Sequence, residues 1–220
     1  MWQPMRCCLC MTNRGWALSS FLRFKTLWRG YSLYVLMILA VVLLVLAEPV
    51  SGEWLRFDRM AVDGGQWWRL LTASWVHLSW QHALGNIAGV ALFAYIAGPS
   101  LNSGRGLLLL CWCVAFVGCG LYLFAPDLYR YAGLSGALHG LLLVAPFVSH
   151  YYGRRIAWLF FVVIVAKVIW EQTPWYNDMA LADVIGGRVE TRSHLLGTLA
   201  GVFFLLQLYW RRVVRLNPGD

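Results

Sequence analysis

The chain has 220 residues, of which 60% are apolar and only 13% are charged. An ordinary soluble domain is about 45–50% apolar and about 25% charged, so the composition excludes a disordered chain and argues against a water-soluble globule. Because a membrane-spanning helix needs about 20 apolar residues, the length fits one helical membrane domain and leaves no room for a second.

The formal net charge of +8 is concentrated toward the two ends of the chain. Basic residues without any acid precede the first apolar run, and more follow the last: Arg6, Arg14, Arg23, Lys25 and Arg29, then Arg211, Arg212 and Arg215. Such charge marks the cytoplasmic side of a membrane protein. We therefore expect residues 1–30 and 211–220 to be cytoplasmic segments, and we expect no nucleic acid as a partner.

The six cysteines fall into two groups, and neither place favours disulfides. Cys7, Cys8 and Cys10 lie in the expected cytoplasmic segment, whereas the other three lie inside an apolar run: Cys111, Cys113 and Cys119. Disulfides persist in oxidising compartments, so we interpret all six as reduced thiols. A metal site or palmitoylation is the alternative for the first group.

The first apolar run covers residues 31–47 and follows the basic segment, as in a signal peptide. Val45-Leu46-Ala47 would suit a cleavage site, but the run is longer than a signal-peptide core and other apolar runs follow it, which favours an uncleaved helix. Residues 48–80 are mixed and rich in tryptophan, which is typical of a segment at the membrane interface.

Five further apolar runs predict five more helices, near 82–100, 106–125, 132–149, 156–170 and 192–210. The chain is therefore predicted to be an all-α, multi-pass membrane protein with a six-helix domain over residues 31–210. An even number of spans places both ends on one side, in agreement with the charges. No cofactor and no metal are expected, and the sequence does not predict an oligomeric state.

Three of these runs contain glycines four residues apart, which lie on one face of a helix: Gly85 and Gly89, Gly136 and Gly140, Gly197 and Gly201. Glycine at this spacing lets two helices approach closely in lipid. Each pair alone is a weak signal, because glycine is common in membrane spans. We expect close helix contacts at these positions.

Few polar side chains interrupt the predicted spans, and such residues are functional candidates because they are costly in lipid. They are His82, Asn86, Ser135, His139, Lys167 and His194. Three of them, His82, Ser135 and His194, lie near the starts of helices that all begin on the outer side. These three groups are therefore expected to converge at one level just below the outer surface.

This set of residues suits a serine nucleophile. Ser135 opens a helix, where free backbone amides stabilise negative charge, and His194 can act as its base. His82 and Asn86 share one helix face and can donate to an oxyanion. The result is a serine hydrolase site without a carboxylate. Structural roles are the alternative for each residue, since Ser135 can cap its helix and the others can form interhelical hydrogen bonds.

At these residues the chain resembles the rhomboid family of intramembrane serine proteases. Trp68-Arg69, His77 and the segment His82-Ala83-Leu84-Gly85-Asn86 are similar to the family's WR and HxxxHxxxN pattern, here with four residues between the histidines. Gly133-Leu134-Ser135-Gly136 resembles the GxSG nucleophile motif, and His194-Leu195-Leu196-Gly197 resembles HxxG on the last helix. The motifs occur in the family's order on the second, fourth and sixth helices.

The resemblance implies that Ser135 is the nucleophile and His194 the general base. It also implies an oxyanion hole from His82, Asn86 and the Ser135 amide. By the same resemblance His77 and Arg69 organise the first outer loop. The predicted fifth helix, near 156–170, and the cap loop near 171–191 form the substrate gate. No third, acidic member is required, so we interpret Glu190 as a surface acid. The chain departs from many rhomboids in carrying His139 where they have tyrosine.

His139 is expected to stack on His194 or to hydrogen-bond with it, and a role as an alternative base is left open. Lys167 and Glu171, four residues apart, are interpreted as an ion pair, with separate solvation as the alternative. His139 and the segment Lys167-Val168-Ile169-Trp170-Glu171-Gln172 resemble the rhombosortases. These bacterial rhomboids are proposed to cut C-terminal Gly-Gly sorting tails of exported proteins.

The resemblance predicts an endopeptidase of the bacterial inner membrane whose site opens to the periplasm. Its partners would be the lipid bilayer and membrane-anchored proteins with a C-terminal apolar tail. A general rhomboid protease with another substrate and an inactive rhomboid-like protein that binds membrane clients are alternatives. A small transporter is a third, although no internal repeat supports it.

Overall fold

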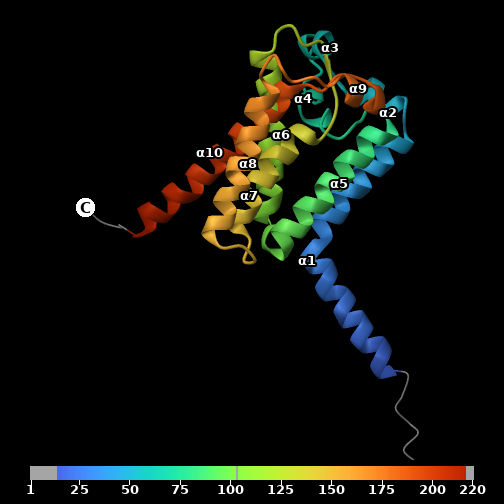
Figure 1. Cartoon of the computed structure of the whole chain (residues 1–220). Helices are drawn as coiled ribbons and strands as arrows, with labels where there is room; N and C mark the ends of the chain where they lie inside the picture. The colour runs from blue at the N-terminus through green and yellow to red at the C-terminus, as the bar shows by residue number, and fades with distance from the viewer. Residues whose placement is uncertain (1–13, 103, 217–220) are drawn as a thin grey trace, which may run out of the picture.

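The computed structural model describes residues 14–102 and 104–216 as a bundle of helices that run side by side (Figure 1). Six helices in this part of the chain are fourteen residues or longer: α1 (Arg14–Leu46), α5 (Trp80–Ala97), α6 (Gly104–Phe124), α7 (Ser135–Val148), α8 (Arg154–Glu171) and α10 (Thr191–Leu216). The prediction of a mostly helical chain is thus confirmed.

Three of the described helices are long and apolar enough to cross a membrane, and they correspond to α5, α6 and α10. The apolar stretch Gly30–Leu46 of α1 and the whole of α7 are shorter. Helix α8 has a suitable length but carries charges at both ends. A set of six membrane spans therefore stays a prediction.

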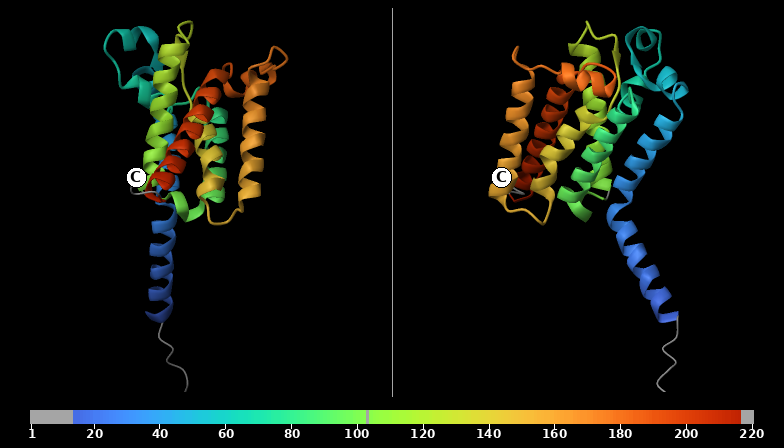
Figure 2. Two further views of the ribbon diagram at one scale, coloured as in Figure 1. Left: turned by 90° about the vertical axis from the view of Figure 1, so that its left-hand side faces the viewer. Right: turned by 45° about the vertical axis from the view of Figure 1, so that its right-hand side comes forward.

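The first helix begins far earlier than predicted, at Arg14 instead of near residue 31. No proline interrupts residues 14–46, so the backbone continues as a helix through the expected boundary at residue 30. The early part of α1 extends beyond the other helices in both views of Figure 2. Cys7, Cys8 and Cys10 lie outside the described residues.

The segment predicted at the membrane interface folds into short elements: α2 (Val50–Leu55), β1 (Phe57–Asp58), α3 (Arg59–Asp63) and α4 (Arg69–Thr72). Strand β1 pairs antiparallel with β2 (Arg130–Tyr131), with Phe57 opposite Tyr131. The guanidinium of Arg59 donates to backbone carbonyls at the end of α6 and just after it, including those of Ala125 and Leu128. The outer loop is thereby joined to the chain that leads into α7.

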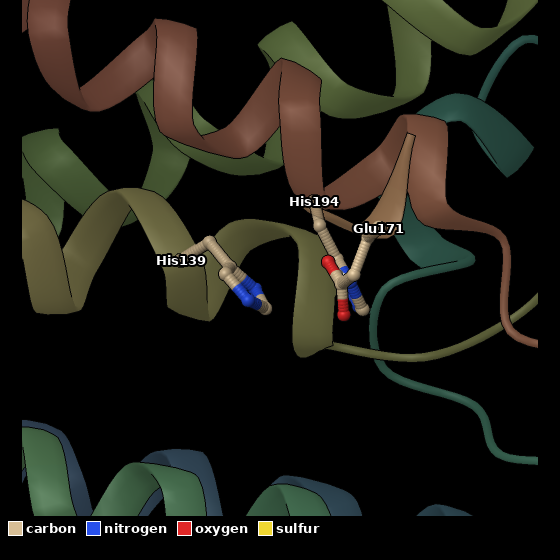
Figure 3. Close-up of side chains that lie close together, drawn as sticks. All are labelled: His139, Glu171 and His194. Carbon is tan, nitrogen blue, oxygen red and sulfur yellow. The ribbon is translucent and has the colours of Figure 1, made fainter. Parts of the chain in front are cut away.

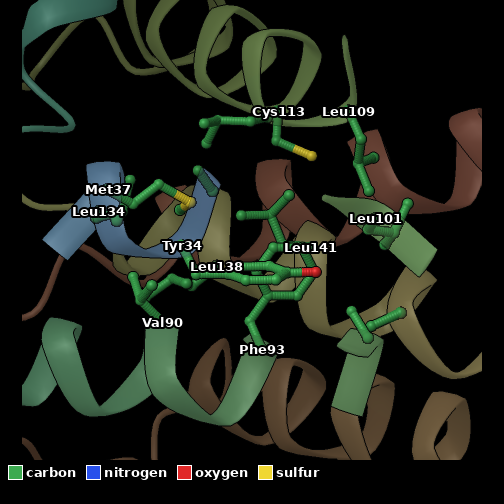
Figure 4. Close-up of a cluster of buried hydrophobic side chains, with 14 of the residues drawn as sticks. Tyr34, Met37, Val90, Phe93, Leu101, Leu109, Cys113, Leu134, Leu138 and Leu141 are labelled. Atoms are coloured by element: carbon green, nitrogen blue, oxygen red, sulfur yellow. The ribbon is translucent and has the colours of Figure 1, made fainter. Parts of the chain in front are cut away.

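The core lies between α1, α5, α6 and α7, and Figure 4 shows its central side chains. Tyr34 is 2% exposed, donates its hydroxyl hydrogen to the carbonyl oxygen of Gly98 at 2.7 Å, and stacks edge-on against Phe93. Gly98 opens the 3-10 turn η1 (Gly98–Leu101), which leads into α6. These contacts position α5 against the rest of the bundle.

Helices α7 and α10 are in backbone contact. A Cβ atom on Gly197 would overlap the carbonyl oxygen of Gly136, and one on Gly140 would overlap the carbonyl oxygen of Gly197. The expectation of close helix contact at these glycines is therefore confirmed, but it is wrong at Gly85. That residue has open space where a Cβ would be and lies on a cavity wall instead of a helix contact.

Candidate active site

Ser135 is the first residue of α7 and follows a tight turn at Gly133. Gly133 has a φ of +124°, in the region that favours glycine. Its missing side chain also leaves room for His82, because a Cβ on Gly133 would lie 2.7 Å from His82 Nε2. The first amides of a helix lack intrahelical partners. The turn thus combines a hydroxyl, amide donors and a nearby imidazole.

His194 lies in the first turn of α10 and is 6% exposed. Its Nε2 is 3.0 Å from Ser135 Oγ. The glycine contact between α7 and α10 makes this separation possible, because side chains at Gly136 and Gly197 would force the helices apart. The structure therefore brings together the two residues predicted as nucleophile and base.

Glu171 is the last residue of α8 and its carboxylate oxygen Oε2 lies 2.9 Å from His194 Nδ1. Figure 3 shows this carboxylate and the two histidine rings directed into one small space. The expectation of a site without a carboxylate is wrong. The sequence could relate Glu171 only to Lys167 on its own helix, because nothing local indicates which other helix it faces. Glu190, interpreted as a surface acid, instead lines the cavity with its side chain 17% exposed, and its carboxylate accepts hydrogen bonds from Arg192.

Lys167 connects α8 with α7. Its ammonium group donates to Glu171 Oε1 and lies 3.0 Å from His139 Nε2. The interpretation of Lys167 and Glu171 as an ion pair is confirmed, and separate solvation of the two side chains is not what the structure shows. The Lys167 ammonium group thereby contacts two of the residues that touch the His194 ring, His139 and Glu171.

His139 stacks on His194, with ring centres 4.1 Å apart and planes inclined by 25°. Its Nδ1 lies 2.7 Å from the carbonyl oxygen of Ser135, which can only accept, so Nδ1 carries the proton. Its Nε2 then accepts from Lys167. Because both ring nitrogens are occupied in this way, the geometry does not favour His139 as an alternative base for Ser135.

His82 and Asn86 form the opposite wall of the site, on α5. The backbone N–H of Leu78 is directed at His82 Nδ1 at 3.4 Å, which leaves Nε2 as the donor toward Gly133. Asn86 is buried, and its Nδ2 donates one hydrogen to the carbonyl oxygen of His82. The second hydrogen on that nitrogen is available to a ligand. Ser79 caps α5 by accepting from the His82 amide.

Arg69 and His77 lie beneath the outer loop. Arg69 is 6% exposed and donates to Gln66 Oε1 and to the carbonyl oxygens of Arg56 and Glu53. His77 packs edge-on against the His82 ring. Burial lowers the pKa of His77 to about 3, with His82 adding to the effect, so the ring is neutral at physiological pH. These contacts agree with an organising role in the loop.

Five of the predicted site residues line one cavity of about 720 Å³: His82, Asn86, Ser135, His139 and His194. Its walls include His82 and Asn86 on one side and Ser135 and His194 on the other. Helix α9 (Met179–Ile185) lies over it, and Ser79 Oγ donates to the carbonyl oxygen of Ile185 at 2.8 Å. The cap loop, residues 171–191, which was predicted as part of the substrate gate, therefore covers the cavity and is attached to the start of α5.

Three side chains in the cavity carry atoms that can bind a metal: His139, Glu171 and His194. The two imidazole rings are stacked, however, so their ring-plane lone pairs do not converge on one point. The Lys167 ammonium group also bonds to both His139 and Glu171. The cluster is arranged as a hydrogen-bond network and is a poor fit to tetrahedral zinc coordination.

Comparison with known proteins bears on the same region. The Rhomboid domain family matches residues 64–211. A protein of Bacillus subtilis (strain 168) named "Putative rhomboid protease YdcA" is 27% identical over 190 residues, a match that covers 83% of this chain and 90% of the relative. The matched region contains every residue that contacts Ser135 or His194 in the cavity.

Proposed function

Because the chain belongs to the rhomboid family and is a serine intramembrane protease, we propose that Ser135 is its nucleophile and His194 its general base. The 3.0 Å separation of Ser135 Oγ and His194 Nε2 on a cavity wall carries this proposal. As Oγ bonds to the scissile carbonyl carbon, Nε2 takes its proton and then gives it to the leaving amine. Water hydrolyses the resulting ester by the same route.

The tetrahedral intermediate carries negative charge on the former carbonyl oxygen. His82 Nε2–H, the free N–H of Asn86 and the amide of Ser135 are the donors proposed to stabilise it. Support comes from Gly133, whose lack of a side chain brings His82 and Asn86 against the turn that precedes Ser135. Each such donor contributes about 3 kcal/mol to stabilising the transition state in related chemistry.

The proposed orientation places residues 31–210 in the bacterial inner membrane as a six-helix protease domain with both chain ends in the cytoplasm. Basic residues near the ends of the sequence support it. So does the position of the site, since α5, α7 and α10 begin toward the end of the bundle covered by α9 (Figures 1 and 2). The cavity then opens toward the periplasm.

The proposed substrate is an exported protein with a C-terminal tail made of Gly-Gly, an apolar helix and a basic cluster. The similarity of His139 and residues 167–172 to rhombosortases supports this. Among these residues, His139 and Glu171 contact the His194 ring, and Lys167 binds Glu171. A basic cluster holds the tail's end on the cytoplasmic side, which brings Gly-Gly to the outer level of Ser135. Glycine also leaves a helix at low cost.

A reconstituted assay tests both parts of this proposal. Purified protein in liposomes is given a reporter with a Gly-Gly tail or the same reporter with Leu-Leu at that position. We expect cleavage of the first only, and none by Ser135→Ala. Cleavage by Ser135→Ala would contradict the catalytic assignment. Equal cleavage of both reporters would support a general rhomboid protease, and cleavage of neither, with Ser135 unreactive to a fluorophosphonate, would support a client-binding protein.

A further inference from the structure

Glu171 is a buried carboxylate that a serine and histidine pair does not require. We propose that it is a positioning residue, the third member of the catalytic unit, and that Lys167 holds it in place. This inference rests on the proposed function of Ser135 and His194. It is carried by the 2.9 Å contact between Glu171 Oε2 and His194 Nδ1.

The hydrogen-bond network determines where the protons lie. Lys167 can only donate, so Glu171 Oε1 and His139 Nε2 both accept from it. An ionised carboxylate only accepts, so His194 Nδ1 carries a proton toward Oε2. His194 Nε2 is then unprotonated and faces Ser135 Oγ. This is the tautomer in which the ring can take the serine proton.

The role of Glu171 appears when His194 becomes charged. The serine proton moves to Nε2 as the bond between Oγ and the carbonyl carbon forms, and His194 becomes an imidazolium ion. The proton on Nδ1 stays on the ring, and the fixed carboxylate stabilises the new positive charge. His139 cannot do this, because it is neutral and presents its ring face to His194. Removal of Glu171 should therefore slow the chemical step.

The groups around Glu171 explain why its carboxylate can be charged although it is buried. Glu171 is 7% exposed, and a buried charge is costly unless it is paired and hydrogen-bonded. Its two oxygens bind Lys167 and His194, which satisfies both. The other ionisable groups near His194 are His82, which lies across the cavity, and Glu190 and Arg192, which bind each other. Among the described residues, Glu171 is the carboxylate in hydrogen-bond contact with His194.

The test measures fluorophosphonate labelling of Ser135 in the full-length protein in detergent, over a series of probe concentrations. We expect Glu171→Gln, which keeps the shape and loses the charge, to lower the maximal labelling rate about 100-fold while the half-saturating concentration is unchanged. Glu171→Ala should be slower still, and added formate should restore it about tenfold because the cavity reaches this position. Glu53→Gln, an exposed acid on α2, is the matched control.

Several outcomes would overturn the inference. Wild-type labelling of both variants would show that the carboxylate is dispensable. Loss of labelling together with a lowered melting temperature, a raised half-saturating concentration and no response to formate would assign Glu171 a structural role only. Failure of the proposed function is separate, because labelling of Ser135→Ala would reveal it whatever Glu171 does.

Discussion

The four helices around the candidate active site are positioned by two kinds of contact. Helices α7 and α10 meet backbone to backbone through glycines. Helix α8 buries only Ala157, Val168 and Glu171 among its side chains and reaches the site through hydrogen bonds. The proposed nucleophile and base are therefore positioned by packing. The Glu171 carboxylate and the segment over the cavity, residues 171–191 (the covering segment), are instead positioned by polar contacts that single substitutions can remove.

Gly197→Leu should disrupt the packing of α7 against α10, and we expect it to have the largest effect on stability and activity among the variants considered. Its side chain would occupy the space of the Gly136 carbonyl, so α7 and α10 must separate. We expect the melting temperature in detergent to fall and fluorophosphonate labelling of Ser135 to disappear, at a cost of about 3 kcal/mol or more. Gly153→Ala, where a Cβ meets nothing within 4 Å, should behave as wild type. A stable, reactive Gly197→Leu protein would refute the packing argument.

Two valines, one on α7 and one on α8, test whether the two helices differ in packing. Val144 on α7 is fully buried, whereas Val162 on α8 is 58% exposed on the outside of the bundle. Val144→Ala should lower the free energy of unfolding by about 2 kcal/mol, because it leaves a cavity between helices. Val162→Ala should change it by less than about 0.5 kcal/mol. Unfolding in a denaturant series measures both, and equal effects would show that α8 packs as tightly as α7.

His139→Phe tests the polar link between α7 and α8. Phenylalanine keeps a ring over His194 but removes the contacts with Lys167 and with the Ser135 carbonyl oxygen. We expect reporter cleavage to slow about tenfold, the equivalent of about 1.4 kcal/mol, with Ser135 still labelled. Complete loss of labelling in a folded protein would instead support His139 as the base.

The sequence predicted the packed side of the site better than the polar side. Ser135, His194 and the glycines between them belong to short local motifs, and their helical spacing shows which residues share a face. The spacing of Lys167 and Glu171 indicated their pairing, but only the tertiary arrangement shows that Glu171 also faces His194. At Gly85 the sequence predicted a contact that does not exist, because a small residue on a helix face can line a cavity as readily as a helix contact.

The sequence likewise predicted only part of the fold. Apolar runs located the long helices, but they could not show that α1 starts at Arg14, because helix formation continues beyond the apolar stretch. The role of Arg59, which binds carbonyls around the end of α6, was also missed. A basic residue in a loop carries no local signal of the helix end that it contacts. Apart from this boundary of α1, the features that the sequence left open are mostly long-range polar contacts.

Substitution of Asp178 has the smallest expected effect, and it tests how the covering segment is held in place. Burial alone raises its pKa, but the hydrogen bond from the Val189 amide and the Arg188 guanidinium outweigh burial, so the pKa of Asp178 lies below its usual value. A lowered pKa in the folded state stabilises the fold above the unfolded value of about 3.9, and this stabilisation is lost as the pH falls through the folded pKa.

Hydrogen exchange of residues 178–189 measures this contribution locally. We expect Asp178→Asn to exchange faster than wild type at pH 7, by a few-fold, because Val189 loses a charged acceptor. The difference should disappear as the pH falls through the lowered pKa of Asp178 in the folded state, because the wild-type carboxyl then becomes protonated as well. Arg188→Gln should have almost no effect, since its side chain is 81% exposed and surface ion pairs contribute little. A difference that persists unchanged at low pH would show that Asp178 acts through its shape, so the charge would not be what holds the covering segment.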